Sequence, residues 1–131
     1  MANIMIEVSP GDFFDRLTIL RIKLRHAGPE QVAGVRAKLD AYELLRQTKF
    51  PPQIQLHGLE ADLTRRNEEL WDLENKVRTF VHPLQPAQAD SYIATTRAIF
   101  DFNEERAVIK REIDLLFSEE SAEGKVYQKD P

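Results

Sequence analysis

The sequence predicts an all-α protein, in which two antiparallel helical hairpins form a four-helix bundle behind a short extended N-terminal segment. Three observations lead to this fold class. Prolines and glycines gather at a few points and divide the chain, and apolar residues between these points recur every three or four positions. The length of 131 residues suits one domain and not two. Cysteine is absent, which excludes disulfide scaffolds, zinc ribbons and thiol catalysis.

The first two helices are expected at residues 10–26 and 29–49. Ser9 can cap the first helix, because its hydroxyl can accept hydrogen bonds from the free amides of the first turn. The apolar arc of this helix is wide, which favours a central position. Folding the chain back between the two helices aligns their apolar stripes, as an antiparallel hairpin requires. Before them, Ile4, Ile6 and Val8 alternate with Met5 and Glu7, a pattern typical of a strand.

The third and fourth helices are expected to end near Val81 and Phe117, and Asp90 or Ser91 can cap the fourth. Their apolar positions alternate at spacings of three and four, which is typical of a coiled-coil seam. We therefore assign residues 1–117 to a single helical domain. Residues 118–131 are acidic and are expected to form a flexible tail, with docking of its last apolar residues beside the N-terminal segment as the alternative.

Polar residues interrupt the apolar seams of the two long helices. Folding these helices back about residue 85 sets Asn67 opposite Asn103 and Leu70 opposite Phe100. Such a layer can fix helix register and oligomeric state, or it can form a ligand site between helices. The candidate ligand-binding residues are Asn67, Trp71, Glu74, Asn103, Arg106 and Lys110. Trp71, the single tryptophan, either packs against a neighbouring helix or anchors an interface.

The sequence indicates no catalytic constellation, metal centre or cofactor. The three histidines are isolated, and no glycine-rich phosphate loop or nucleophile elbow is present. One alternative places magnesium between two pairs of acids on facing helices. These pairs are Glu69 with Asp72 and Asp101 with Glu104.

Charge divides the chain into two parts. Residues 13–49 hold eight basic and four acidic side chains, whereas residues 50–117 hold eight basic and twelve acidic ones. The two hairpins should therefore attract each other, or the basic one could meet an anionic partner through Arg16, Arg21, Lys23, Arg25, Arg36 and Lys38. The net charge of −4 and the lack of interleaved aromatic residues argue against nucleic acid as a partner. No apolar run is long enough to span a membrane, and no signal peptide is evident, so a cytoplasmic location is expected.

Several segments resemble a family of small bacterial all-helical proteins, a domain of unknown function. They are residues 6–11 (IEVSPG), 15–20 (DRLTIL) and 22–24 (IKL), then the pattern from Asn67 to Glu74 and that from Asn103 to Lys110. The resemblance covers most of the chain. It implies an accessory role beside glycosyltransferases of surface-polysaccharide synthesis.

These observations favour a non-enzymatic interaction or accessory module that acts through its helical surface. Because the last two helices look longer than the first two, part of their seam should be covered by a second copy, which predicts a homodimer. A protein partner of another kind is also compatible with this surface. The alternative is a small ligand-binding protein or enzyme with a polar site between helices, and a metal-dependent nucleotide hydrolase ranks below both.

Overall fold

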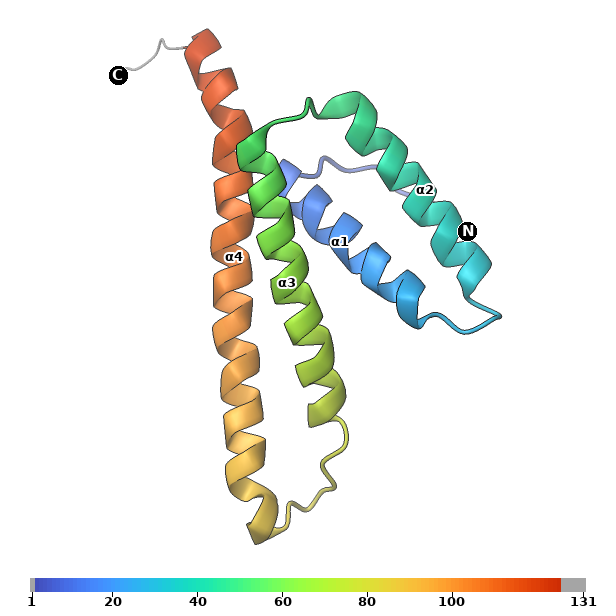
Figure 1. Ribbon diagram of the computed structural model, residues 1–131, viewed down its shortest axis with the longest axis vertical. Coiled ribbons are helices and arrows are strands. Elements are labelled where there is room, and N and C mark those ends of the chain that lie inside the picture. Colours follow the sequence, from blue (N-terminus) through green and yellow to red (C-terminus); the bar gives the residue numbers. More distant parts are fainter. Residues whose placement is uncertain (1, 126–131) are drawn as a thin grey trace.

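The computed structural model describes the backbone of residues 2–125 and the side chains of residues 2–118. This part of the chain holds four α-helices and no strand, which confirms the predicted all-α class. The elements are α1 (Pro10–His26), α2 (Val32–Lys49), α3 (Ile54–Val77), the short 3₁₀ helix η1 (Pro86–Gln88) and α4 (Ala89–Lys125). The long helices α3 and α4 lie side by side, and α1 and α2 form a second pair set at an angle to them (Figure 1).

Helix α1 is the centre of the molecule, as its wide apolar arc predicts. It packs against α2, α3 and α4, whereas the backbone of α2, within the described residues, approaches α1 alone. The protein is therefore a three-helix core of α1, α3 and α4 with α2 on the outer side of α1. Seven apolar residues form one buried cluster: Phe14, Leu17, Leu20, Leu39, Leu56, Leu63 and Ile113.

Two hydrogen bonds hold the first turn of α1 in place. Ser9 caps it by accepting a hydrogen bond from the amide of Asp12 at 3.1 Å. The amide of Gly11 donates to the Asp114 carboxylate of α4 at 2.6 Å. A side chain at Gly11 would overlap the carbonyl oxygen of Lys110, so glycine is what lets the first turn of α1 approach the backbone of α4 so closely.

Some predicted boundaries are wrong. Residues 4–8 form no strand, because residues 2–125 hold no second strand to pair with their backbone groups, and Met5 is 95% exposed. Helix α3 ends at Val77, before the predicted Val81. Helix α4 continues past Phe117 to Lys125, so the helix includes the first part of the predicted tail. The expectation for residues 126–131 lies outside the described residues.

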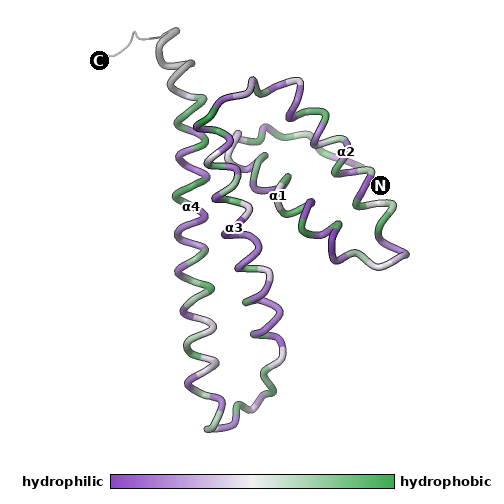
Figure 2. Tube along the Cα trace, viewed as in Figure 1, coloured by the Kyte–Doolittle hydropathy of each residue, from purple (hydrophilic) through white to green (hydrophobic). Residues whose placement is uncertain are grey.

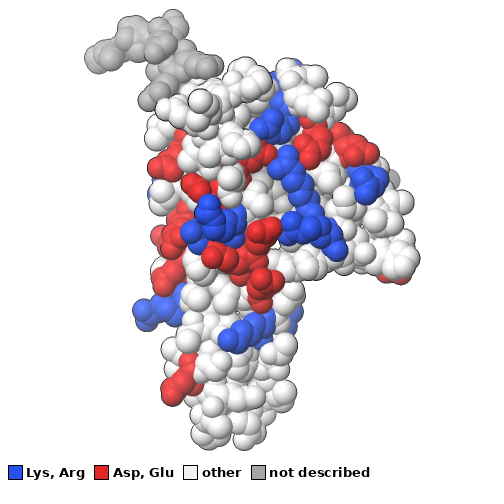
Figure 3. All heavy atoms as spheres, viewed as in Figure 1, with Lys and Arg blue, Asp and Glu red and all other residues white. Residues whose placement is uncertain are grey.

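The long helices extend beyond α1 and α2 at the end that carries their connecting loop (Figure 1). Here Leu73 and Val77 are only half-buried and Val81 is 66% exposed, because only two helices pack together. Figure 3 shows charged side chains gathered where α1, α2 and α3 meet, whereas this end is mostly uncharged in the same view.

Candidate functional site

A polar cluster lies where α1, α3 and α4 meet, at the position of the predicted polar layer. We define it as Asp12, Asp15, Thr18, Asn67, Arg106 and Lys110. Asn67 of α3 is 4% exposed, and its amide group donates to Asp15 at 3.0 Å and to the Thr18 hydroxyl at 2.9 Å. Its carbonyl oxygen accepts from Arg106 of α4 at 3.3 Å. One amide side chain therefore joins three helices.

The charges of the polar cluster balance one another. Lys110 pairs with Asp12 at 2.8 Å, and both Lys110 and Arg106 lie 3.9 Å from Asp15. The hydrogen bond from Lys110 lowers the pKa of the Asp12 carboxyl below its ordinary value, against the smaller effect of burial, which raises it. Two carboxylates thus face two cations, and the buried Asn67 amide bonds to one of each, Asp15 and Arg106. This arrangement holds the register of three helices.

The structure brings together only part of the predicted site. Asn67, Arg106 and Lys110 meet in the polar cluster. Asn103 is half-buried, and its side chain makes no hydrogen bond within the described part of the chain, so the two asparagine side chains are not bonded to each other. Leu70 is buried, whereas Phe100, which the fold-back sets opposite it, is 62% exposed.

The remaining predicted site residues lie elsewhere. Trp71 stacks on His26, at the end of α1, with ring centroids 4.9 Å apart. Glu74 is exposed. Asp15 and Thr18 are site residues that were not predicted from the sequence. They share the buried face of α1 with Phe14, and the signal that identifies them is a polar residue on an apolar arc.

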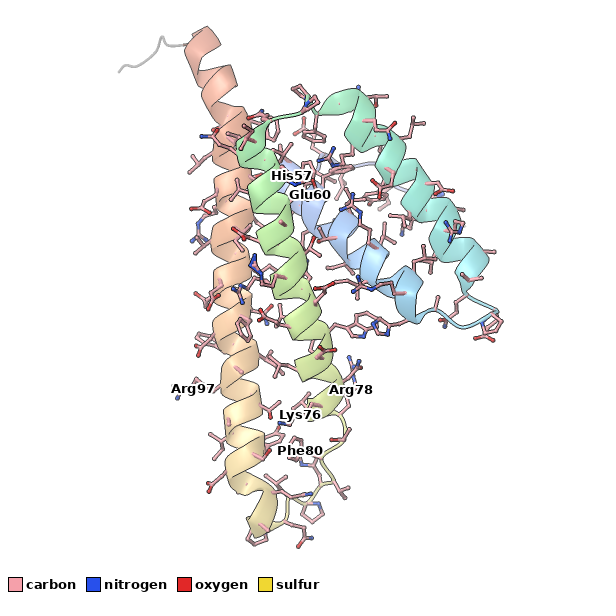
Figure 4. The ribbon with its side chains drawn as sticks, in the orientation of Figure 1. His57, Glu60, Lys76, Arg78, Phe80 and Arg97 are labelled. Atoms are coloured by element: carbon pink, nitrogen blue, oxygen red, sulfur yellow. The ribbon has the colours of Figure 1, made fainter. Side chains whose placement is uncertain are left out.

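A second group of charges joins α1, α2 and α3. Glu60 of α3 is 7% exposed and accepts hydrogen bonds from Arg46 at 2.5 Å and from Arg21 at 2.7 Å. Figure 4 shows Glu60 on the side of α3 that faces the shorter helices. Arg21 also makes two bonds to Glu43, each of 2.9 Å. Burial opposes ionisation of Glu60, but the hydrogen bonds from both arginines outweigh it, and the pKa of Glu60 is lowered.

This lowered pKa makes stability depend on pH. At neutral pH we expect Glu60→Gln to reduce the free energy of unfolding by about 2 kcal/mol, because two partly buried arginines lose their charged partner. The contribution of an acid whose pKa is lowered by folding is complete above its unfolded pKa, about 4.3 for glutamate, and is lost as pH falls through the folded value. Urea unfolding at pH 7, 5 and 3 measures the difference between wild type and variant, which should shrink at the lowest pH.

Glu68→Gln is the matched control for Glu60→Gln. Glu68 pairs with Arg25 at 2.8 Å, but both side chains are largely exposed, so we expect a change below about 0.5 kcal/mol. If the difference in free energy of unfolding between wild type and Glu60→Gln stays constant from pH 7 to pH 3, ionised Glu60 is not the source of the stabilisation.

The two pairs of acidic residues that could hold magnesium do not come together in one site. Glu69 is bonded to Arg66 of its own helix, and Asp72, Asp101 and Glu104 are exposed. Within the residues that the structure describes, no three histidine, aspartate or glutamate side chains come close enough to share a cation.

No family model matches the chain, and no curated protein or solved structure matches it. Along residues 2–125, none of the helices has the length and apolar character needed to cross a membrane.

Proposed function

We propose that this protein is a non-enzymatic interaction module that associates with a second copy of itself through the outward face of α4. An exposed apolar stripe supports the proposal. Ile93, Phe100, Val108 and Leu115 are 59%, 62%, 44% and 59% exposed. Because they follow one another at seven or eight residues, close to two helical turns, they lie on one side of α4.

Charged residues occupy the intervening turns of this stripe. Arg97, Glu104 and Arg111 are exposed, and Arg97 points away from α3 (Figure 4). The hydropathy of α4 accordingly alternates along the helix (Figure 2). None of the three forms an ion pair with a residue in the described part of the chain. We call these seven residues the α4 stripe.

The order of charges makes the α4 stripe of one copy complementary to the α4 stripe of a second copy that runs in the opposite direction. When two copies of α4 lie antiparallel about a point between residues 100 and 101, Arg97 of each copy faces Glu104 of the other. The two Phe100 rings then meet at the twofold axis, and Ile93 lies against Val108. A contact of this kind is a closed twofold interface and covers Ile93, Phe100 and Val108. In this proposal each copy consists of two antiparallel hairpins, and only the longer one makes the contact.

The proposal predicts a dimer that depends on Phe100. Sedimentation equilibrium at tens of micromolar protein should show a dimer, and Phe100→Glu should weaken the association by at least tenfold, on the order of 2 kcal/mol for a central aromatic contact. Leu44→Glu is the matched control, since Leu44 on α2 is also 62% exposed but lies outside the α4 stripe.

A charge swap tests the antiparallel arrangement. Arg97→Glu and Glu104→Arg should each weaken the dimer, because like charges then face each other, and the double variant should restore it. A wild-type protein that stays monomeric at tens of micromolar would contradict the proposed function. A dimer that survives Phe100→Glu unchanged would place the contact on another surface.

A further inference from the structure

Two hollows open between α1 and α2 on one side of α1, and Lys23 lines both. The larger, about 420 Å³, is lined by Lys23, His26, Ala27, Gln31, Val35 and Trp71. The smaller, about 250 Å³, is lined by Arg16, Ile19, Leu20, Lys23, Lys38 and Tyr42. Their α1 residues recur at helical spacing, so both hollows follow one face of that helix. We refer to them together as the α1–α2 groove.

The lining of the α1–α2 groove is basic and contains no carboxylate. This is unusual in a chain with 22 acidic residues and a net charge of −4. Arg16, Lys23 and Lys38 form no ion pair with any residue among those described. Asp12 lies near enough to Arg16 for the two charges to interact, but its carboxylate is bonded to Lys110.

The other cations of α1 differ from those of the groove. Arg21 is paired with Glu43 and Glu60, and Arg25 is paired with Glu68. The charges on one side of α1 are therefore neutralised within the protein, whereas those facing the groove are not. Unpaired cations gathered in a concave, partly apolar site create a positive potential that attracts an anion.

The two ends of the α1–α2 groove differ in chemistry. Arg16 and Lys23 are two turns apart, about 10 Å along the helix axis, with Lys38 across the groove. The other end carries Val35 and Trp71, whose indole is held by stacking on His26. An extended ligand can therefore place anionic groups over the cations and a planar ring beside the tryptophan.

We propose that the α1–α2 groove binds an organic phosphate that carries an aromatic ring, such as a nucleoside diphosphate. The phosphates lie over Arg16, Lys23 and Lys38, and the ring lies beside Trp71. This ligand site is independent of the proposed self-association, because the groove lies between α1 and α2 and the α4 stripe lies on the outward face of α4.

Trp71 is the only tryptophan, so its fluorescence reports directly on the groove. Titration with ADP should change the fluorescence saturably. Pyrophosphate should bind about tenfold more weakly because it lacks the ring, and adenosine should not bind measurably because it lacks the phosphates. Lys23→Glu should weaken ADP binding at least tenfold. Lys49→Glu, the same charge change at an exposed lysine outside the groove lining, should leave ADP binding within about twofold.

Three results would overturn this inference. The first is no saturable change with millimolar ADP while circular dichroism shows a folded protein. The second is an equal loss of affinity in Lys23→Glu and Lys49→Glu, which would mean that only net charge matters. The third is that pyrophosphate binds as tightly as ADP, which would mean that the aromatic ring contributes nothing to binding. Sedimentation equilibrium of the same samples measures self-association, so a failure of ligand binding can be distinguished from a failure of the proposed dimer.

Discussion

Gly11→Ala is expected to lower the free energy of unfolding by about 3 kcal/mol. The new methyl group would overlap the carbonyl oxygen of Lys110 and lie 3.0 Å from the Asp114 carboxylate, so the first turn of α1 must move away from α4. This movement lengthens the 2.6 Å hydrogen bond from the Gly11 amide to Asp114, and a bond to a charged group contributes more than a neutral one. Urea unfolding followed by circular dichroism measures the loss.

Gly58→Ala is the control for Gly11→Ala, and its expected effect has the opposite sign. A methyl group at Gly58, in α3, meets no atom within 4 Å. Because alanine is the better helix former, we expect the variant to be more stable by about 0.5–1 kcal/mol. If both substitutions stabilise the protein, the close approach of α1 to α4 does not determine the residue at Gly11.

Asn67→Leu is the second large change that we expect, with a loss of about 3 kcal/mol. The amide of Asn67 donates to Asp15 and Thr18 and accepts from Arg106, and leucine removes all three bonds at once. The buried Asp15 carboxylate then loses its nearest donor, and a buried charge without hydrogen bonds is costly. Thermal and urea unfolding both measure this loss.

Asn103→Leu is the matched control for Asn67→Leu, because it is the same substitution on the facing helix. Asn103 is half-buried and its side chain makes no hydrogen bond within the described residues, so we expect a change below about 1 kcal/mol in either direction. An Asn67→Leu variant with a raised melting temperature would show that the polar cluster is dispensable for stability.

The polar cluster also determines which face of α4 is left outward. Arg106, Lys110 and Asp114 follow one another at four residues on α4. Lys110 and Asp114 bond to α1, and Arg106 donates to Asn67 of α3 and lies 3.9 Å from Asp15 of α1. Fixing this side of α4 toward α1 leaves Phe100 and Val108 pointing away from the core. The internal contacts of the protein therefore position the surface that we propose for self-association.

The sequence predicts the helices well where the signals are local. Ser9 before Pro10 indicates the first residue of α1, and the structure confirms both the cap and the end at His26. The spacing of apolar residues likewise identifies the buried positions Leu56, Leu63 and Leu70 of α3. Periodicity could not reveal that residues 4–8 have no neighbouring strand in the part of the chain that the structure describes, because strand formation requires a partner elsewhere in the chain.

The candidate site was predicted only in part, for a related reason. If α3 and α4 are folded as an isolated pair, Asn67 and Asn103 face each other. In the structure α1 packs into this pair, and its Asp15 and Thr18 become the partners of Asn67. A register between two helices can be estimated from their connecting loop, but the rotation of each helix depends on a third helix that is distant in the sequence.

The sequence by itself therefore determined the all-α class, the start of α1 and the apolar face of each long helix, because caps and helical periodicity act between residues a few positions apart. The tertiary structure alone decided the partners of Asn67, the close approach at Gly11 and the outward position of Phe100. These depend on how faces from separate helices pack together, and no local pattern in the chain encodes that choice.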